Sequence, residues 1–277
     1  FRMPRHVISV INSLHRPAIF GMIHVPALPG TPSNTMTVPH ILDIVTKEAE
    51  IYHRNGVDGI IVENMHDIPY VRADKIGPEI VSTMSMACSI VSSICQSRRL
   101  NMALGVQILA GANKEALAVA HATGFDFIRA ECFVFSHVAD EGWMDGCAGD
   151  LLRYRKMIGA DRVAVFTDIK KKHSSHTVTS DVSICETAKA AEFFLADGVI
   201  LTGTSTGTKA NIQELKDVMD ATSLPVLIGS GIDVWNVKEY SSAKGYIVGS
   251  SLKKNGDWKS ELCSDRVKRL TQAVKRL

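Results

Sequence analysis

Aromatic residues are scarce in this sequence, and neither sign of charge dominates. Phe, Trp and Tyr together make up 6% of the 277 residues, whereas hydrophobic residues of all kinds make up 45%. The core must therefore consist mainly of aliphatic side chains, as in α/β proteins. The formal net charge is only +2, which argues against nucleic acid as the main partner, because phosphate backbones require a basic surface.

Long hydrophobic runs and closely paired cysteines are also missing. No apolar run approaches the ~18 residues that a membrane-spanning helix needs, so we expect no membrane span. None of the six cysteines belongs to a C-x-x-C pair. Cys88 and Cys95 share the apolar face of a predicted helix, where thiols are usually inert. This use of cysteine fits a reducing compartment.

Acidic side chains are absent from the first residues. The chain starts with Phe1 rather than Met, and its early basic residues are Arg2, Arg5, His6 and Arg16. A basic, acid-free segment fits either a trimmed targeting peptide or an arbitrary start of the sequence. On the first interpretation we expect a mitochondrial location, with the cytoplasm as the alternative. We treat residues 1–17 as an N-terminal extension and residues 18–277 as one domain.

Short apolar strands alternate with amphipathic helices through the whole domain. The predicted strands cover residues 20–24, 59–63, 103–108, 127–131, 162–170, 198–202, 225–229 and 246–249. Such alternation implies a parallel sheet, and eight units in roughly 250 residues are the pattern of a (β/α)8 TIM barrel. A doubly wound open sheet is the alternative, but the G-x-G-x-x-G that normally follows its first strand is absent.

Polar side chains gather at the carboxyl ends of the predicted strands, where barrel enzymes carry out their chemistry. Successive side chains of a strand point to opposite faces. Counting on this basis places the following residues on the inner face near the strand ends: His24, Glu63, Gln107, Glu131, Asp168 and Lys170. Arg129 also faces inward, and we expect it to pair with one of the acids. The site is therefore predicted at this mouth.

Residues 168–176 hold an acid, three lysines and two histidines. Adjacent lysines alone are typical of a solvated segment after a strand. Asp168 at a buried strand end is harder to explain in that way, because a buried acid is costly without a partner or a task. Together with the other strand ends, this gives the catalytic candidates Asp168, Glu131, Glu63, Lys170, Lys172, His24 and His173.

Glycine-rich turns follow the last three strands. In barrels the loops after the seventh and eighth strands commonly bind phosphate through backbone N–H groups and a helix N-terminus. A helix is predicted to open near Asp233, directly after one of these turns. Tight turns without a ligand are the alternative. The phosphate-binding candidates are Thr202, Gly203, Gly229, Ser230, Gly231, Gly249 and Ser250.

A metal ion is possible, although the sequence predicts no cofactor. Histidine and carboxylate side chains at the strand ends are suitable ligands, but neither H-x-H nor H-E-x-x-H spacing occurs. The candidate ligands are His24, Glu63, Glu131 and Asp168.

Several blocks of the chain resemble, in order, those of the BtpA family. They are residues 21–30 (GMIHVPALPG), 58–64 (DGIIVEN), 129–131 (RAE), 168–174 (DIKKKHS), 201–203 (LTG), 229–231 (GSG) and 247–253 (IVGSSLK). The resemblance implies a barrel similar to the ribulose-phosphate-binding barrels. A cyanobacterial member is associated with photosystem I assembly, but no agreed reaction follows from membership.

These observations favour an enzyme acting on a small phosphorylated metabolite, such as a sugar phosphate or a nucleotide-like molecule. Asp168 or Glu131 would act as general base and Lys170 or Lys172 as its electrostatic partner. An isomerase, a lyase or an enzyme that cleaves a glycosyl bond would fit. A non-catalytic assembly factor and a phosphate-binding regulator are the alternatives. A homo-oligomer is possible.

Overall fold

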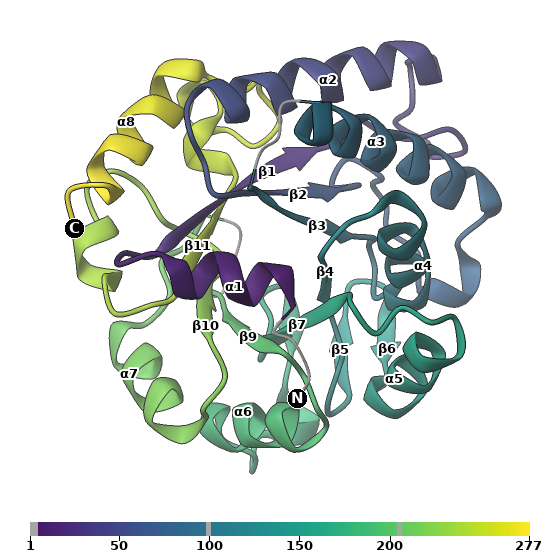
Figure 1. Ribbon diagram of the computed structural model, residues 1–277. Helices are drawn as coiled ribbons and strands as arrows, with labels where there is room; N and C mark the ends of the chain where they lie inside the picture. Colours follow the sequence, from purple (N-terminus) through teal and green to yellow (C-terminus); the bar gives the residue numbers. More distant parts are fainter. Residues whose placement is uncertain (1–4, 98–100, 204–206) are drawn as a thin grey trace.

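Eight parallel strands close into a barrel in the computed structural model, which describes residues 5–97, 101–203 and 207–277. Around the barrel the order is β1-β11-β10-β9-β7-β4-β3-β2 (Figure 1). The barrel strands are β1 (Ala18–His24), β2 (Gly59–Glu63), β3 (Ala103–Gln107), β4 (Phe127–Ala130), β7 (Ala164–Ile169), β9 (Gly198–Leu201), β10 (Val226–Ile228) and β11 (Gly245–Val248). The predicted (β/α)8 barrel is confirmed.

Helices surround the barrel after seven of these strands. They are α2 (Val38–Arg54), α3 (Pro78–Ser97), α4 (Asn113–Thr123), α5 (Ala148–Met157), α6 (Ile184–Phe193), α7 (Ile212–Ala221) and α8 (Ser264–Val274). After β10 the described chain has only a short 3-10 turn, η3 (Val237–Tyr240). The prediction of a regular helix opening near Asp233 is therefore wrong, because an Asx turn of Asp233 occupies its start.

The long connection after β4 contains regular structure that the sequence did not predict. Strands β5 (His137–Ala139) and β6 (Gly142–Met144) form a hairpin, and β8 (Ser174–Ser175) pairs with β5. This small antiparallel sheet joins the connection after β4 to the loop after β7, because β8 belongs to that loop. Strands of two or three residues are too short to show an alternating pattern, so periodicity could not reveal them.

Three phenylalanines pack against three glycines in the barrel interior. The rings of Phe20, Phe127 and Phe166 meet edge to face, with centroids 5.5 and 5.6 Å apart. A Cβ atom on Gly59, Gly105 or Gly198 would lie within 2.5 Å of one of these rings or of a neighbouring carbonyl oxygen. The glycines thus leave the space that the rings occupy.

The N-terminal segment closes the end of the barrel that lies opposite the carboxyl ends of the strands. Helix α1 (His6–Ser13) lies across the opening in Figure 1. Its Val7, Val10 and Ile11 are buried against the interior cluster. Arg5 pairs with Asp197, and Arg16 binds Asp58 at 2.7 and 2.9 Å. These basic residues therefore have structural partners.

Helix α3 corrects the expectation that no segment has the length and composition of a membrane span. Residues 78–96 reach a mean hydropathy of 1.3 in an 18-residue window. Core helices of soluble proteins pass the same test, and Met84, Cys88 and Val91 on its inner side are fully buried. A single helix of this kind is weak evidence for a membrane span.

Candidate functional site at the barrel mouth

His24 and Glu63 stand next to each other at the ends of β1 and β2. The two strands pair them in register, and His24 Nε2 lies 3.6 Å from Glu63 Oε2. Both side chains are buried. Burial and then the charge of Lys253 hold the pKa of His24 well below its ordinary value, so the imidazole is neutral. Burial raises the pKa of Glu63, although nearby Arg129 opposes this shift.

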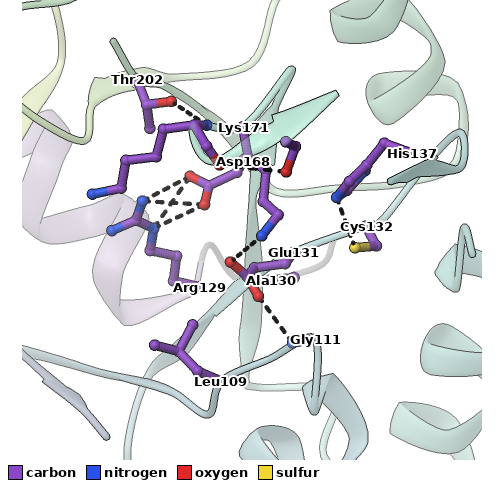
Figure 2. A network of polar contacts seen from close by, with 12 residues as sticks. Leu109, Gly111, Arg129, Ala130, Glu131, Cys132, His137, Asp168, Lys171 and Thr202 are labelled. Atoms are coloured by element: carbon purple, nitrogen blue, oxygen red, sulfur yellow. Dashed lines mark hydrogen bonds and ion pairs between the residues drawn. The ribbon is translucent and has the colours of Figure 1, made fainter. Parts of the chain in front are cut away.

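Arg129 of β4 and Asp168 of β7 form a buried ion pair, which confirms that Arg129 pairs with one of the acids (Figure 2). Arg129 Nε lies 3.2 Å from each carboxylate oxygen of Asp168, and Arg129 Nη2 lies 3.1 Å from Oδ2. Burial raises the pKa of Asp168, while Arg129 opposes the rise. The pair fixes a guanidinium inside the mouth.

Glu131 forms a second buried ion pair, with Lys171. Lys171 Nζ lies 3.1 Å from Glu131 Oε1, and the backbone N–H of Gly111 donates to Oε2 at 2.9 Å (Figure 2). Burial alone would raise the pKa of Glu131, but Lys171 and these hydrogen bonds lower it below its ordinary value. The side chain is therefore a stable carboxylate.

The sequence did not single out Lys171, and it misplaced Lys170. The backbone of Lys170 has a φ of 46°, in the left-handed region, so the extended strand ends there. Lys170 Nζ instead donates to the carbonyl oxygen of Thr179 at 2.8 Å. The expectation that Lys170 lies beside Asp168 is thus wrong. His173, with a φ of 54°, has an exposed side chain.

Lys172 does reach the mouth. It lines the main cavity together with His24, Glu63 and Arg129. Burial and then the charge of Arg129 lower its pKa, whereas Glu63 and the other acids oppose this. Its Nζ has no hydrogen-bond or ion-pair partner among the described residues. Asp168 and Glu131 do not line this cavity. Asp168 binds Arg129, which lines it, and Glu131 binds Lys171, which precedes Lys172 in the chain.

The main cavity is named for the strand-end groups that it contains and not for its size, which is about 460 Å³. It extends from these groups to residues 229–231 after β10 and 249–251 after β11, the glycine loops. Five phosphate-binding candidates line it: Gly229, Ser230, Gly231, Gly249 and Ser250. The backbone N–H groups of four residues there have no acceptor in the described part of the chain: Gly231, Ile232, Ser250 and Ser251. Such donors can bind an anion without a side chain.

Hydrogen bonds within the protein occupy the polar atoms of three other candidates, Thr202, Gly203 and Ser230. The Thr202 hydroxyl accepts from the N–H of Lys172 at 3.2 Å, and Ser230 Oγ accepts from the N–H of Gly203 at 2.9 Å. Ser230 also donates to the carbonyl of Thr208. Thr202 and Gly203 do not line the main cavity. These residues hold the loops together.

Arg266 and Arg269 of α8 also line the main cavity, although the strand pattern of the sequence did not predict them there. Arg266 Nη1 donates to the carbonyl of Ser251 at 3.1 Å. Arg266 lies in the first turn of α8, where the helix dipole disfavours positive charge. This unfavourable position is a signal that the sequence did contain.

The four metal candidates do not form a metal site. His24 and Glu63 are neighbours, but Asp168 binds Arg129 and Glu131 binds Lys171. Within the ranges that the structure describes, no three His, Cys, Asp or Glu side chains are close enough to share an ion.

A buried thiol and imidazole lie beside the second ion pair. Cys132 Sγ is 3.5 Å from His137 Nε2. Burial, followed by the charge of Glu131, raises the pKa of Cys132 far above its ordinary value, and burial lowers that of His137 to about 4. Both groups are neutral, which argues against a nucleophilic thiolate.

Fold and site together define a TIM barrel whose buried ionizable groups and glycine loops meet at the carboxyl mouth. Solved barrels share the fold at low identity. Orotidine 5'-monophosphate decarboxylase from Methanocaldococcus jannaschii, complexed with the inhibitor BMP, has a TM-score of 0.56 at 15% identity and covers 94% of this chain and 99% of its own. Phosphoribosyl anthranilate isomerase from Thermus thermophilus has a TM-score of 0.54 at 12% identity and covers 94% and 98%.

The sequence model of the BtpA family matches residues 15–276, and the chain belongs to this family. A Caenorhabditis elegans protein whose name describes it as uncharacterized and mitochondrial is 56% identical, over 99% of this chain and 98% of its own. The photosystem I biogenesis protein BtpA of Synechocystis is 32% identical, over 94% and 88%. The family resemblance seen in the sequence is confirmed.

Proposed function

We propose that this barrel is an enzyme that acts on a small phosphorylated metabolite by acid–base chemistry. The observation that carries the proposal is the composition of the main cavity. One wall presents ionizable groups with shifted pKa values, and the other presents backbone donors without acceptors. Perturbed groups and anion-binding loops in one cavity are typical of an active site.

In this proposal Glu63 and Lys172 transfer protons and Arg129 stabilises negative charge. Asp168 and Glu131 each hold a cation, so they position other groups instead of acting as the general base. The raised pKa of Glu63 and the lowered pKa of Lys172 bring both toward neutrality, where acid–base catalysis is most efficient. An isomerase, a lyase or an enzyme that cleaves a glycosyl bond fits this set.

The phosphate would bind at the loops after β10 and β11. The N–H groups of residues 231, 232, 250 and 251 favour a dianion as the ligand, because they lack acceptors. Arg266 and Arg269 add positive charge nearby. The solved barrels named above support this only by fold.

A screen of phosphorylated metabolites tests the proposal. The parent protein is incubated with sugar phosphates and nucleotides, and products are measured by mass spectrometry. We expect turnover of at least one compound, and Glu63→Gln should lower its rate 10²–10⁴-fold, as loss of a general acid or base does. Glu50→Gln, on the outer surface of α2, is the matched control and should retain the rate. Equal rates in parent and Glu63→Gln would remove Glu63 from the mechanism.

The Synechocystis relative is named for photosystem I biogenesis, which keeps a non-catalytic assembly role as the second candidate. An assembly factor or a regulator would not need ionizable groups inside the mouth. Binding of phosphorylated compounds without turnover of any would favour the regulator.

A mitochondrial location is also part of the proposal. It is supported by the name of the worm relative. Cell fractionation would test it, and recovery in the cytosol alone would contradict it.

A further inference from the structure

A second cavity, of about 500 Å³, opens beside the main one. Its described walls come from residues 170–176 after β7, residues 202 and 203 after β9, the first residue of α6, and residues between 209 and 214 at the start of α7. The lining residues that matter here are Lys170, Lys171, Lys172, Thr202, Lys209 and Glu214. Apart from Lys172, which the proposed mechanism uses for proton transfer, none of these residues has a role in the proposed function.

Positive charge dominates the cavity, because four of its lining residues are lysines and Glu214 is the one acid among them. Lys170 binds only the neutral oxygens of Thr179. Lys172 and Lys209 have no side-chain partner in the described ranges. Lys171 is neutralised by Glu131. A concave site lined by one sign of charge concentrates ligands of the opposite sign.

The lysines are not a solvated run. Lys171 is 8% exposed and Lys172 is partly buried, so their charges lie inside the protein. Keeping these cations in a cavity is costly unless an anion compensates for them. Lys172 has no side-chain partner among the described residues and is the cation that an anion would compensate. Lys209 is exposed and adds positive charge to the cavity wall.

The two cavities border each other. Lys172 lines both, and β9, which leads into the second cavity, pairs with β10, which leads into the first. A single small molecule can thus contact the glycine loops with one end and the lysines with the other, while its middle lies at Arg129 and Glu63.

We infer that the second cavity binds a second anionic group of the same ligand. The substrate class is then a small metabolite with two acidic groups: a phosphate at the glycine loops and a phosphate or carboxylate at Lys172 and Lys209. This inference rests on the proposed phosphate site and deepens it.

Calorimetric titration with three probes tests the inference. Ribulose 5-phosphate carries one anionic group, ribulose 1,5-bisphosphate adds a phosphate, and 6-phosphogluconate adds a carboxylate. The parent should bind at least one of the doubly anionic probes about tenfold more tightly than ribulose 5-phosphate. Lys209→Gln should weaken that probe about fivefold and change ribulose 5-phosphate less than twofold, the size expected for one exposed charge. The probe with the larger effect identifies the second group.

Lys216→Gln is the matched control, because Lys216 is exposed on α7 and does not line the cavity. It should leave all three affinities unchanged. Equal affinities of the parent for all three probes, or equal losses for all three in Lys209→Gln, would overturn the inference and leave the phosphate site standing. Failure of every probe to bind the parent would overturn the phosphate site, and the inference with it.

Discussion

At the scale of single residues, the mouth depends on two buried ion pairs that cross between strands. Arg129 reaches from β4 to Asp168 of β7, and Lys171 returns from the loop after β7 to Glu131 beyond β4. Such pairs add little net stability by themselves, but removal of one partner leaves an uncompensated buried charge. Their value lies in fixing where the charges are.

Lys171→Met should therefore destabilise the protein by about 3 kcal/mol, as the loss of one partner of a buried pair does. Lys171→Met combined with Glu131→Gln should recover most of this, because the glutamine oxygen can still accept from the N–H of Gly111. Urea unfolding measures both. Lys156→Met is the control, since the Lys156–Asp161 pair is exposed and should be worth less than about 1 kcal/mol.

The same pair predicts a pH dependence. The pKa of Glu131 is lowered in the folded protein, so its contribution is present above the ordinary glutamate pKa and is lost as the pH falls through the folded-state value. In Lys171→Met burial raises this pKa instead. The stability deficit of the variant should shrink as the pH is lowered toward 5, and a deficit that grows would contradict the assignment.

At the scale of elements, the strand ends could be predicted, but the loops between them could not. Alternation along β1, β2 and β7 correctly placed His24, Glu63 and Asp168 inside, because extended strands obey a period of two. The rule fails at Lys170, because its left-handed backbone ends the extended strand. As a result Lys171, and not Lys170, pairs with a buried acid. Lys171 and the hairpin β5–β6 therefore depend on local geometry that the sequence pattern does not contain.

Inside the barrel, the close contacts between glycines and phenylalanine rings can be tested by substitution. A Cβ at Gly105 would lie 2.3 Å from the ring of Phe127. Gly105→Ala should thus cost about 1–3 kcal/mol by overpacking, measured by urea unfolding. Phe127→Leu in the same chain should restore part of the loss, because it removes the clashing ring atoms. Gly149→Ala in α5 is the control: its nearest neighbour is the flexible end of Arg153, and helix propensity favours alanine. Equal costs at both positions would contradict the packing argument.

At the scale of the whole molecule, the sequence predicted the architecture and the mouth better than the composition of the main cavity. Both ends of every barrel strand were predicted within two residues, because βα alternation repeats along the chain. Arg266 and Arg269 come from the last helix, α8, and reach the main cavity only in the packed barrel. The one local signal, a basic residue in the first turn of α8, does not by itself indicate a cavity, so both residues were missed.

Ligand binding should stabilise the whole molecule if the glycine loops hold phosphate. A phosphorylated ligand at about 100 times its dissociation constant adds roughly 2.7 kcal/mol, which for a chain of this size raises the melting temperature by about 5–10 °C. The dephosphorylated compound should not do so. Differential scanning fluorimetry measures the shift.

Substitutions at Ser250 test whether the rise in melting temperature comes from phosphate at the glycine loops. Gly249 is unsuitable, because a Cβ there would lie 2.8 Å from the His24 ring. Ser250→Asp places a negative charge beside the free N–H groups and should abolish the shift, because like charges repel the phosphate. Ser250→Asn has nearly the same size without the charge and should keep at least part of it. If both variants retain the parent shift, the phosphate binds elsewhere; if both lose it equally, size and not charge is responsible.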